Sequence, residues 1–290
     1  MAFSDLTLKV AAEEAVQALH TQMAPLSYFA KNYSELEDRK GATIAIPSFA
    51  NLSAAAEFNV STNNYGSGQN EVDGILLNLD KHFLKALAID DRALLETDIQ
   101  WIKDGSEAIA QELGRAANRY VFGLMNTTNV TLTANFDVGT KSQPTAHKLY
   151  EVAATNDLPI EDTVVVLDPE NFADLLGITD FAMFGGREGV VFGNIPRLFS
   201  FAGVVMSQFI PEGFNGLLVP KKAVGMCSRY LAPLPGAYVD TWKATDQDSG
   251  LTTGWRVYQS LDTGKRNLCG ELLFGAKLIM PGKIVGLKNT

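Results

Sequence analysis

Histidine side chains are the first groups in this sequence that could bind a metal or move a proton. The chain has three, His20, His82 and His147. None of them lies in an H-x-x-x-H or H-E-x-x-H pattern, the spacings that bring two ring nitrogens to one metal ion from one helix. We therefore expect no metal site and interpret His82 and His147 as surface or contact residues.

Cysteine chemistry is equally sparse. The two cysteines, Cys227 and Cys269, are far apart in the sequence. A disulfide framework or a zinc site needs more cysteines at closer spacing. Because a reduced cysteine behaves as a small apolar side chain, we expect both thiols to lie in the core.

Motifs for nucleophilic or phosphate chemistry are absent from the sequence. It holds no G-x-S-x-G elbow, no phosphate-binding glycine loop and no G-x-G-x-x-G. The Gly185-Gly186 pair lacks the lysine that a phosphate loop needs, so it predicts a turn. Asp90 and Asp91 would point to opposite faces of a strand, and we interpret them as capping residues ahead of a helix. We expect no catalytic residue and no cofactor.

The composition is that of a folded globular protein. Of the 290 residues 46% are apolar, and the formal net charge is −9. Neutralising nucleic-acid phosphates requires clustered Lys and Arg, so we expect any DNA to be enclosed without sequence-specific contacts. Charged residues interrupt residues 1–20, and no apolar run reaches membrane-spanning length. We therefore expect no signal peptide, no membrane partner and synthesis in the cytosol.

Hydrophobic periodicity predicts the elements in the N-terminal part. Leu8 and Leu19 share the apolar face of a helix that ends near Pro25, and we interpret this helix as an arm more than a core element. Alternating apolar residues over 42–47 and 75–79 predict two strands that flank a polar tip. An isolated two-stranded ribbon is marginally stable in water. A neighbouring subunit is a natural candidate for holding it, and packing on its own domain is the alternative.

A long helix is predicted from about Thr97 to Met125. Thr97 and Gln100 have the spacing of a capping box, and the apolar residues that follow form one helical face. Gly105 and Gly114 are candidate positions for a bend in this helix.

The middle of the chain alternates between helix and strand. We predict a helix over 145–155, a buried strand over 163–167, and a helix that begins at Asp168-Pro169 and stops at Gly177. Another strand is predicted over 216–220.

Turn residues and apolar runs organise the remaining segments. Residues 187–211 join two apolar runs through glycine and proline turns, without a reactive side chain. Two-residue alternation predicts a strand over 255–261, a turn over 262–265 and a second strand over 268–280. A last short strand ends at Leu287.

In this order the elements resemble the major capsid protein of tailed bacteriophages, which has the Hong Kong 97-type fold. The resemblance covers nearly the whole chain, and the order and spacing of the elements carry it. The segments are LLNLDKHFLKALAIDD (76–91), the helix over 97–125, VVVLDPENFADLL (164–176), REGVVFGNIPRLFSFAGVVMSQFIP (187–211), GLLVPKKAVGMCSRYL (216–231) and WRVYQSLDTGKRNLCGELLFGAKLIMPGKIVGL (255–287).

The resemblance implies an α+β fold with four parts. In residues 216–231 it implies a strand followed by a helix. The implied parts are an N-terminal arm (1–40), an extended two-stranded loop (41–85), a peripheral domain that contains the long spine helix (86–143 and 250–290) and an axial domain (144–249).

The resemblance also implies a function. Many copies, as hexamers and pentamers, would self-assemble into an icosahedral shell around packaged double-stranded DNA, and a procapsid would mature by expansion. The protein would be structural and not an enzyme, would be part of the virion, and would be assembled in the host bacterial cytoplasm. Because the chain begins directly with the arm, we expect a separate scaffolding protein beside a portal, and we expect no covalent crosslink.

Inter-subunit contacts are expected from the arm and the extended loop. Phe58 and Tyr65 could serve as aromatic anchors at an interface, or could pack within their own subunit. The candidate contact residues are Leu8, Leu19, Phe58, Tyr65 and Gly66.

Two other functions remain open. An encapsulin-like nanocompartment shell resembles the phage shell but holds enzyme cargo. A cytosolic α+β enzyme would assemble its site from scattered carboxylates such as Asp168, Asp174 and Asp180, although no nucleophile or metal constellation is recognisable.

Overall fold

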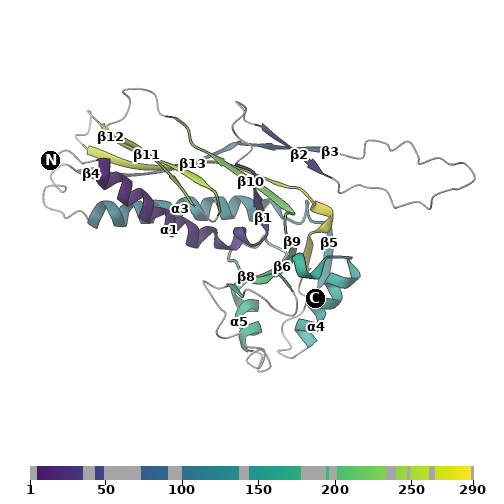
Figure 1. Ribbon diagram of the computed structural model, residues 1–290. Coiled ribbons are helices and arrows are strands. Elements are labelled where there is room, and N and C mark those ends of the chain that lie inside the picture. The colour runs from purple at the N-terminus through teal and green to yellow at the C-terminus, as the bar shows by residue number, and fades with distance from the viewer. Residues whose placement is uncertain are drawn as a thin grey trace, which may run out of the picture.

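A computed structural model describes residues 5–34, 43–48, 73–90, 100–136, 144–177, 194–195, 201–232, 240–246, 249–260 and 265–288. Within these residues the strands form two six-stranded sheets and a two-stranded ribbon. Helices lie against both larger sheets (Figure 1). The predicted α+β class is confirmed.

The first sheet has the strand order β1-β10-β13-β12-β11, and β4 pairs with β13 outside this path. Helices α1 and α3 run side by side along it (Figure 1). All its strand pairs are antiparallel except β1 with β10. Its elements are β1 (Ala30–Asn32), β4 (Lys81–Asp90), β10 (Val224–Arg229), β11 (Asp240–Thr245), β12 (Thr252–Ser260) and β13 (Lys265–Leu278), with α1 (Asp5–Ser27) and α3 (Gln100–Leu124).

Residues of β13 explain why the helices cover one face of this sheet. Leu268, Leu272 and Phe274 are buried in the cluster that also holds the apolar face of α3. Gly270 lies on the same face, where an added Cβ would be 2.5 Å from Cγ2 of Ile109. Alternate residues of a strand share a face, so the residues between these point to the other side of the sheet.

The second sheet has the order β5-β14-β9-β6-β8-β7. Its central strand β6 is buried at every position, because Val164 and Val166 face the α1/α3 cluster while Val165 and Leu167 face the cluster of α4 and α5. Burial on both faces explains the continuous apolar run. The elements are β5 (Leu132–Asn135), β6 (Thr163–Leu167), β7 (Asn194–Ile195), β8 (Gly203–Met206), β9 (Gly216–Pro220) and β14 (Val285–Lys288), with α4 (Pro144–Thr155), α5 (Pro169–Gly177) and the short 3-10 helices η2 (Ile160–Asp162) and η4 (Pro281–Lys283).

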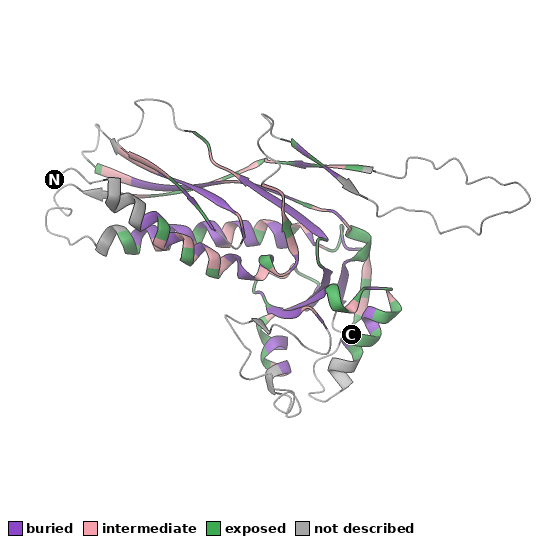
Figure 2. Ribbon diagram, viewed as in Figure 1, coloured by how far each residue is buried: buried purple, intermediate pink, exposed green. Residues whose placement is uncertain are grey.

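The ribbon consists of β2 (Thr43–Ser48) and β3 (Asp73–Asn78), paired antiparallel with Thr43 opposite Asn78. The two predicted strands are therefore confirmed. In Figure 2 strands β10 and β13 are largely buried and β4 is exposed or half-buried, whereas the ribbon strands alternate between exposed positions and buried or half-buried ones.

The helix predictions hold with small shifts. Helix α1 continues past Pro25 to Ser27, and α3 spans Gln100–Leu124. Thr97, half of the predicted capping box, lies outside the described residues. No helix in the described part of the chain is long and apolar enough to cross a membrane.

The helix expected near the end of residues 216–231 is wrong, because Val224–Arg229 forms strand β10. Lys222, with φ 67°, turns the chain out of β9, and β10 then pairs with β13. A short apolar run does not by itself distinguish a buried strand from a buried helix. Pairing with β1 and β13 decides the outcome.

Sheet membership also departs from the predicted domain boundaries. Strands β5 and β14 fall within 86–143 and 250–290 but belong to the second sheet, whereas β10 and β11 fall within 144–249 and belong to the first. Membership depends on pairing between segments far apart in the chain, which a division by consecutive ranges does not capture.

Candidate functional site

The β2–β3 ribbon is the element predicted to reach a neighbouring subunit, and its base is held by its own subunit. Ile44, Ile46 and Leu77 are buried in one cluster with Cys227 and Ile279. For the base of the ribbon, the alternative of packing on its own domain is therefore correct.

Hydrogen bonds also hold the base of the ribbon in place. Thr43 Oγ1 donates to Asn78 Oδ1 at 2.9 Å, which ties the two strands together. The hydroxyl of Tyr120 on α3 donates to Asp80 at 3.3 Å, in the link between β3 and β4. Burial of the phenol, with the nearby Asp80 carboxylate as the second cause, raises the pKa of Tyr120 to about 12.

The predicted loop contacts Phe58, Tyr65 and Gly66 lie outside the described residues. Among the described residues of β3 and β4, two large apolar side chains that the sequence did not single out are exposed. Leu76 on β3 is 50% exposed, and Leu84 on β4 is 58% exposed. The contact role of the loop stays a prediction.

The N-terminal helix differs from the predicted arm, because it packs along the core of its own subunit. Leu19 is only 1% exposed, within the cluster that contains α3 and the first sheet. Its prediction as an inter-subunit contact is therefore wrong. Leu8 lies on α1, but its side chain is outside the described part. Amphipathicity shows that a helix has an apolar face, but not which surface covers it.

Two side-chain hydrogen bonds to backbone carbonyls connect helices α1 and α3. Ser106 Oγ donates to the carbonyl of Ala11 at 3.1 Å, and Asn118 Nδ2 donates to the carbonyl of Gln22 at 2.6 Å. Both residue numbers increase from the first contact to the second, so the helices run parallel.

Gly105 and Gly114 lie where neighbouring elements come close to α3. A Cβ on Gly114 would be 2.7 Å from Cβ of Gln22, and one on Gly105 would be 3.0 Å from Cδ2 of Leu87. The helix is continuous through both positions. Close packing accounts for these glycines, and their role in bending stays a prediction.

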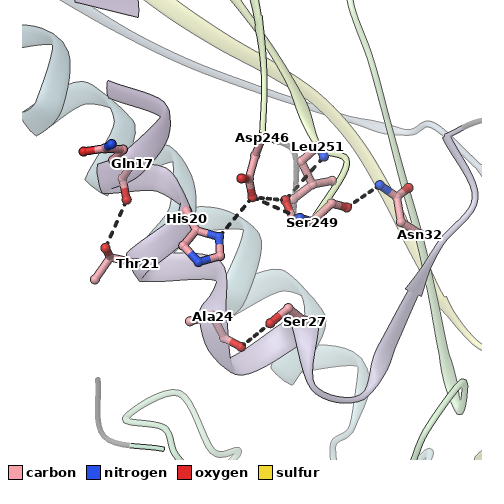
Figure 3. A network of polar contacts seen from close by, with 9 residues as sticks. All are labelled: Gln17, His20, Thr21, Ala24, Ser27, Asn32, Asp246, Ser249 and Leu251. Atoms are coloured by element: carbon pink, nitrogen blue, oxygen red, sulfur yellow. Dashed lines mark hydrogen bonds and ion pairs between the residues drawn. The ribbon is translucent and has the colours of Figure 1, made fainter. Parts of the chain in front are cut away.

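A polar network joins α1 to the turn between β11 and β12 (Figure 3). Nδ1 of His20 is 3.3 Å from Oδ2 of Asp246, and the same oxygen accepts a bond from Ser249 Oγ at 2.5 Å. In a Ser-His-Asp catalytic triad the histidine lies between the serine and the carboxylate. Here the carboxylate lies in the middle, so the histidine is not placed to activate the serine, and the network acts as a structural connection.

The same network continues into β1 and β10. Asn32 Nδ2 donates to the carbonyl of Ser249 (Figure 3), and Asn32 Oδ1 accepts bonds from the backbone N–H and hydroxyl of Ser34. The hydroxyl of Ser34 in turn accepts from the backbone N–H of Ser228 at 3.0 Å. Gly250, with φ 66°, leaves room for Asn32, because a Cβ there would be 2.6 Å from Asn32 Nδ2.

An ionic cluster lies on the face of the first sheet that points away from α3. The buried carboxylate of Glu271 accepts a hydrogen bond from the guanidinium of Arg256, and its other oxygen is 3.3 Å from Nε2 of His82. These residues come from β13, β12 and β4, so the cluster links three strands. His82 is half exposed, as its prediction as a surface or contact residue implies. The side chain of His147 lies outside the described part.

Of the scattered carboxylates, the structure describes two, Asp168 and Asp174. Asp168 caps α5, since its Oδ1 accepts a bond from the backbone N–H of Asn171 at 3.0 Å, as predicted. Asp174 lies further along α5, and Asp180 is outside the described residues. In the ranges that the structure describes, no three His, Cys, Asp or Glu side chains are grouped to hold a metal ion.

Both cysteines are buried, as predicted. Burial, with the nearby Glu271 carboxylate as the second cause, raises the pKa of the Cys269 thiol. A raised pKa keeps a thiol protonated and therefore slow to react.

The sequence did not identify Asp246 or Glu271 as buried charges. Glu271 interrupts the apolar run LCGELLF, and a charged residue at such a position is expected to be paired. That signal could have identified Glu271. Its partners Arg256 and His82 come from other strands, and no local pattern indicates them.

A family model described as "Phage capsid protein" matches residues 77–265, well over half of the chain. The match runs from the end of β3 through α3 and strands β5 to β9 of the second sheet to the start of β13. No curated protein matches the sequence.

Several solved structures of capsids and a virus-like particle are similar to this chain. The capsid of an empty GTA particle has a TM-score of 0.60 at 11% identity, covering 92% of this chain and 90% of that chain. The capsid of cyanophage Pam1 has a TM-score of 0.56 at 14% identity, covering 92% of each chain. The virus-like particle of Pyrococcus furiosus has a TM-score of 0.56 at 10% identity, covering 97% and 98%.

At these identities the structural likeness shows the fold, which is the predicted Hong Kong 97-type fold. The family match adds the class of protein, and the predicted resemblance is confirmed. The chain belongs to the phage capsid protein family.

Proposed function

We propose that hexamers and pentamers of this capsid protein close into the icosahedral shell of a tailed phage around double-stranded DNA. The family match over residues 77–265 carries this proposal, because it covers elements of both sheets and the long helix. A net charge of −9 supports enclosure of DNA without tight binding to its phosphates. The encapsulin-like alternative is less well supported, because the matching family is a phage capsid family.

Contacts between copies are proposed to come from the ribbon and the surface near it. Shell subunits need heterologous contacts whose rotations close. The exposed Leu76 on β3 and Leu84 on β4 offer apolar surface, and the loop that carries Phe58 and Tyr65 directly precedes β3 in the chain. Leu8 remains a candidate at the N-terminal end, whereas Leu19 is excluded by its burial.

The remaining parts of the proposal concern assembly. A separate scaffolding protein and a portal act with this chain in the host bacterial cytoplasm, and a procapsid expands as DNA enters. Expansion of this kind is a rigid-body rearrangement with local bending. The protein acts through packing between copies and carries no enzymatic activity.

Electron microscopy of the purified protein, alone and with the phage's scaffolding protein, tests the proposal. We expect capsomers or closed shells, and a protein that stays monomeric under all these conditions would contradict the proposal. Removal of residues 59–70 is expected to leave a folded subunit whose assembly is impaired. Normal shells from this deletion would show that the loop does not hold neighbours together.

A further inference from the structure

We propose that the direction in which the β2–β3 ribbon leaves the subunit is set within the subunit, by a seat that Gly275 and Cys227 form on the first sheet. A neighbour would then meet a ribbon that is already oriented. The inference rests on the proposed function, since it takes the ribbon to contact another copy.

Gly275 and Cys227 lie directly opposite each other in the β13–β10 pair. Opposite residues of an antiparallel pair share a face of the sheet. Their neighbours Phe274 and Met226 belong to the core beneath α1 and α3, so the seat lies on the face away from these helices.

The backbone of the ribbon passes directly over Gly275. A Cβ at this position would lie 2.2 Å from the carbonyl oxygen of Asn78 and 3.2 Å from Cα of Leu79. Backbone atoms cannot rotate away as the end of a flexible side chain can. The close approach therefore requires glycine, and the missing side chain determines how near the ribbon lies to the sheet.

Apolar side chains fill the space beside this contact. Cys227 is 0% exposed and lies with apolar residues from both ribbon strands and with Ile279, which directly follows β13. Such burial favours one ribbon position, because lifting the ribbon would expose the cluster to water. The other members are Ile44, Ile46, Leu77 and Ile279.

Polar bonds hold the ribbon root on two further sides. Lys277, on the same face of β13 as Gly275, donates from Nζ to the carbonyl of Leu76 at 3.1 Å. Tyr120 of α3 donates to Asp80, just past the end of β3. The root is thus held from β10, β13 and α3 of one subunit, which lowers the ordering entropy lost when the ribbon meets a neighbour.

Cys227 reports directly on the seat. In a Cys269→Ala background it is the remaining thiol, and its labelling by a maleimide can be followed in unassembled subunits. We expect labelling at least about a hundredfold slower than in the denatured chain. Labelling as fast as in the denatured chain, with protection only in assembled shells, would show that neighbours hold the ribbon and would overturn the proposal.

Gly275→Ala tests the close approach of the ribbon backbone to Gly275 in the seat. We expect it to speed Cys227 labelling about tenfold or more, because the added methyl group must displace Asn78. In shells we expect an altered diameter or lost closure. Gly282→Ala is the matched control, since an added Cβ there meets nothing within 4 Å, and it should behave as wild type. Wild-type labelling and wild-type shells from Gly275→Ala would overturn the proposal.

A second variant covers the case in which Gly275→Ala does not fold. Lys277→Met removes the bond to Leu76 from an exposed position, and we expect labelling of Cys227 to rise about threefold. An unchanged rate would count against the seat. The labelling needs no assembly, so a protected Cys227 in a chain that never forms shells would refute the proposed function and leave the seat intact.

Discussion

Helix α1 and the β2–β3 ribbon differ in how much of each segment is buried within the subunit. Helix α1 is buried at regular intervals, from Ala12 to Leu26, against α3 and the first sheet. Of the ribbon side chains that the structure describes, Ile44, Ile46 and Leu77 are buried, and Leu76 is 50% exposed. One segment is part of the core, and the other is attached to it.

The contrast follows from geometry. An amphipathic helix presents one apolar stripe, and a parallel neighbour can cover that stripe over several turns. A two-stranded ribbon has two faces and two edges, and a single subunit covers only the part that lies on its sheet. We therefore expect changes in α1 to alter subunit stability and changes in the ribbon to alter assembly.

The largest expected effect is in the core of α1. Leu19→Ala should lower the free energy of unfolding by about 2–5 kcal/mol, because it leaves a cavity in a buried cluster. The ribbon counterpart Leu76→Ala should change it by less than about 0.5 kcal/mol. Urea unfolding of unassembled subunits measures both. Equal losses would remove the distinction between the two segments.

Gly114→Ala examines the contact between α1 and α3. The added methyl group should separate the helices at Gln22 and cost about 1–3 kcal/mol, although alanine is the better helix former. Gly123→Ala in the same helix is the control, since its Cβ would meet nothing within 4 Å, and it should be stabilising by up to about 1 kcal/mol. If both variants are stabilised, the close approach at Gly114 is not required.

Asp246→Ala probes the polar connection between α1, β1 and the β11–β12 turn. The buried hydroxyl of Ser249 loses this acceptor, which should cost about 1–3 kcal/mol. His20→Ala, at the partly exposed end of the network, should cost less than about 1 kcal/mol. In Asp246→Ala the rate of hydrogen exchange should increase more for the α1 amides than for the β4 amides. A larger increase for the β4 amides than for the α1 amides would show that Asp246 does not hold the N-terminal segment.

The smallest effect concerns the root of the ribbon and depends on pH. The folded-state pKa of Tyr120, about 12, lies above the usual value of 10.0, so the folded protein keeps the phenolic proton longer. The contribution of the protonated Tyr120 to the free energy of unfolding is fully present below pH 10.0 and is lost as the pH rises through about 12. The difference in unfolding free energy between wild type and Tyr120→Phe should therefore fall across this window. A constant difference would contradict the burial of Tyr120 at the root.

Much of the fold could be predicted from local sequence patterns. Alternation located both ribbon strands, and Asp168-Pro169 located the start of α5. The strand β10 was missed because a short apolar run is compatible with either regular structure. The division of strands between the sheets was missed because β14 pairs with β9 and β5, which lie far away in the chain.

The candidate site was predictable to a smaller extent. The sequence indicated an extended ribbon and the identity of the family, and both depend on patterns within short segments. The seat at Gly275 was not predictable, since it exists only where Asn78 crosses β13.

The sequence alone determined where the apolar faces are, where helices α1, α3, α4 and α5 lie, and that no familiar catalytic motif is present. The tertiary structure decided what covers each face. Leu19 became core because α3 lies beside it, and Glu271 could be buried because Arg256 and His82 meet it from other strands. Periodicity is a property of consecutive residues, whereas burial is a property of the surfaces that the folded chain brings together.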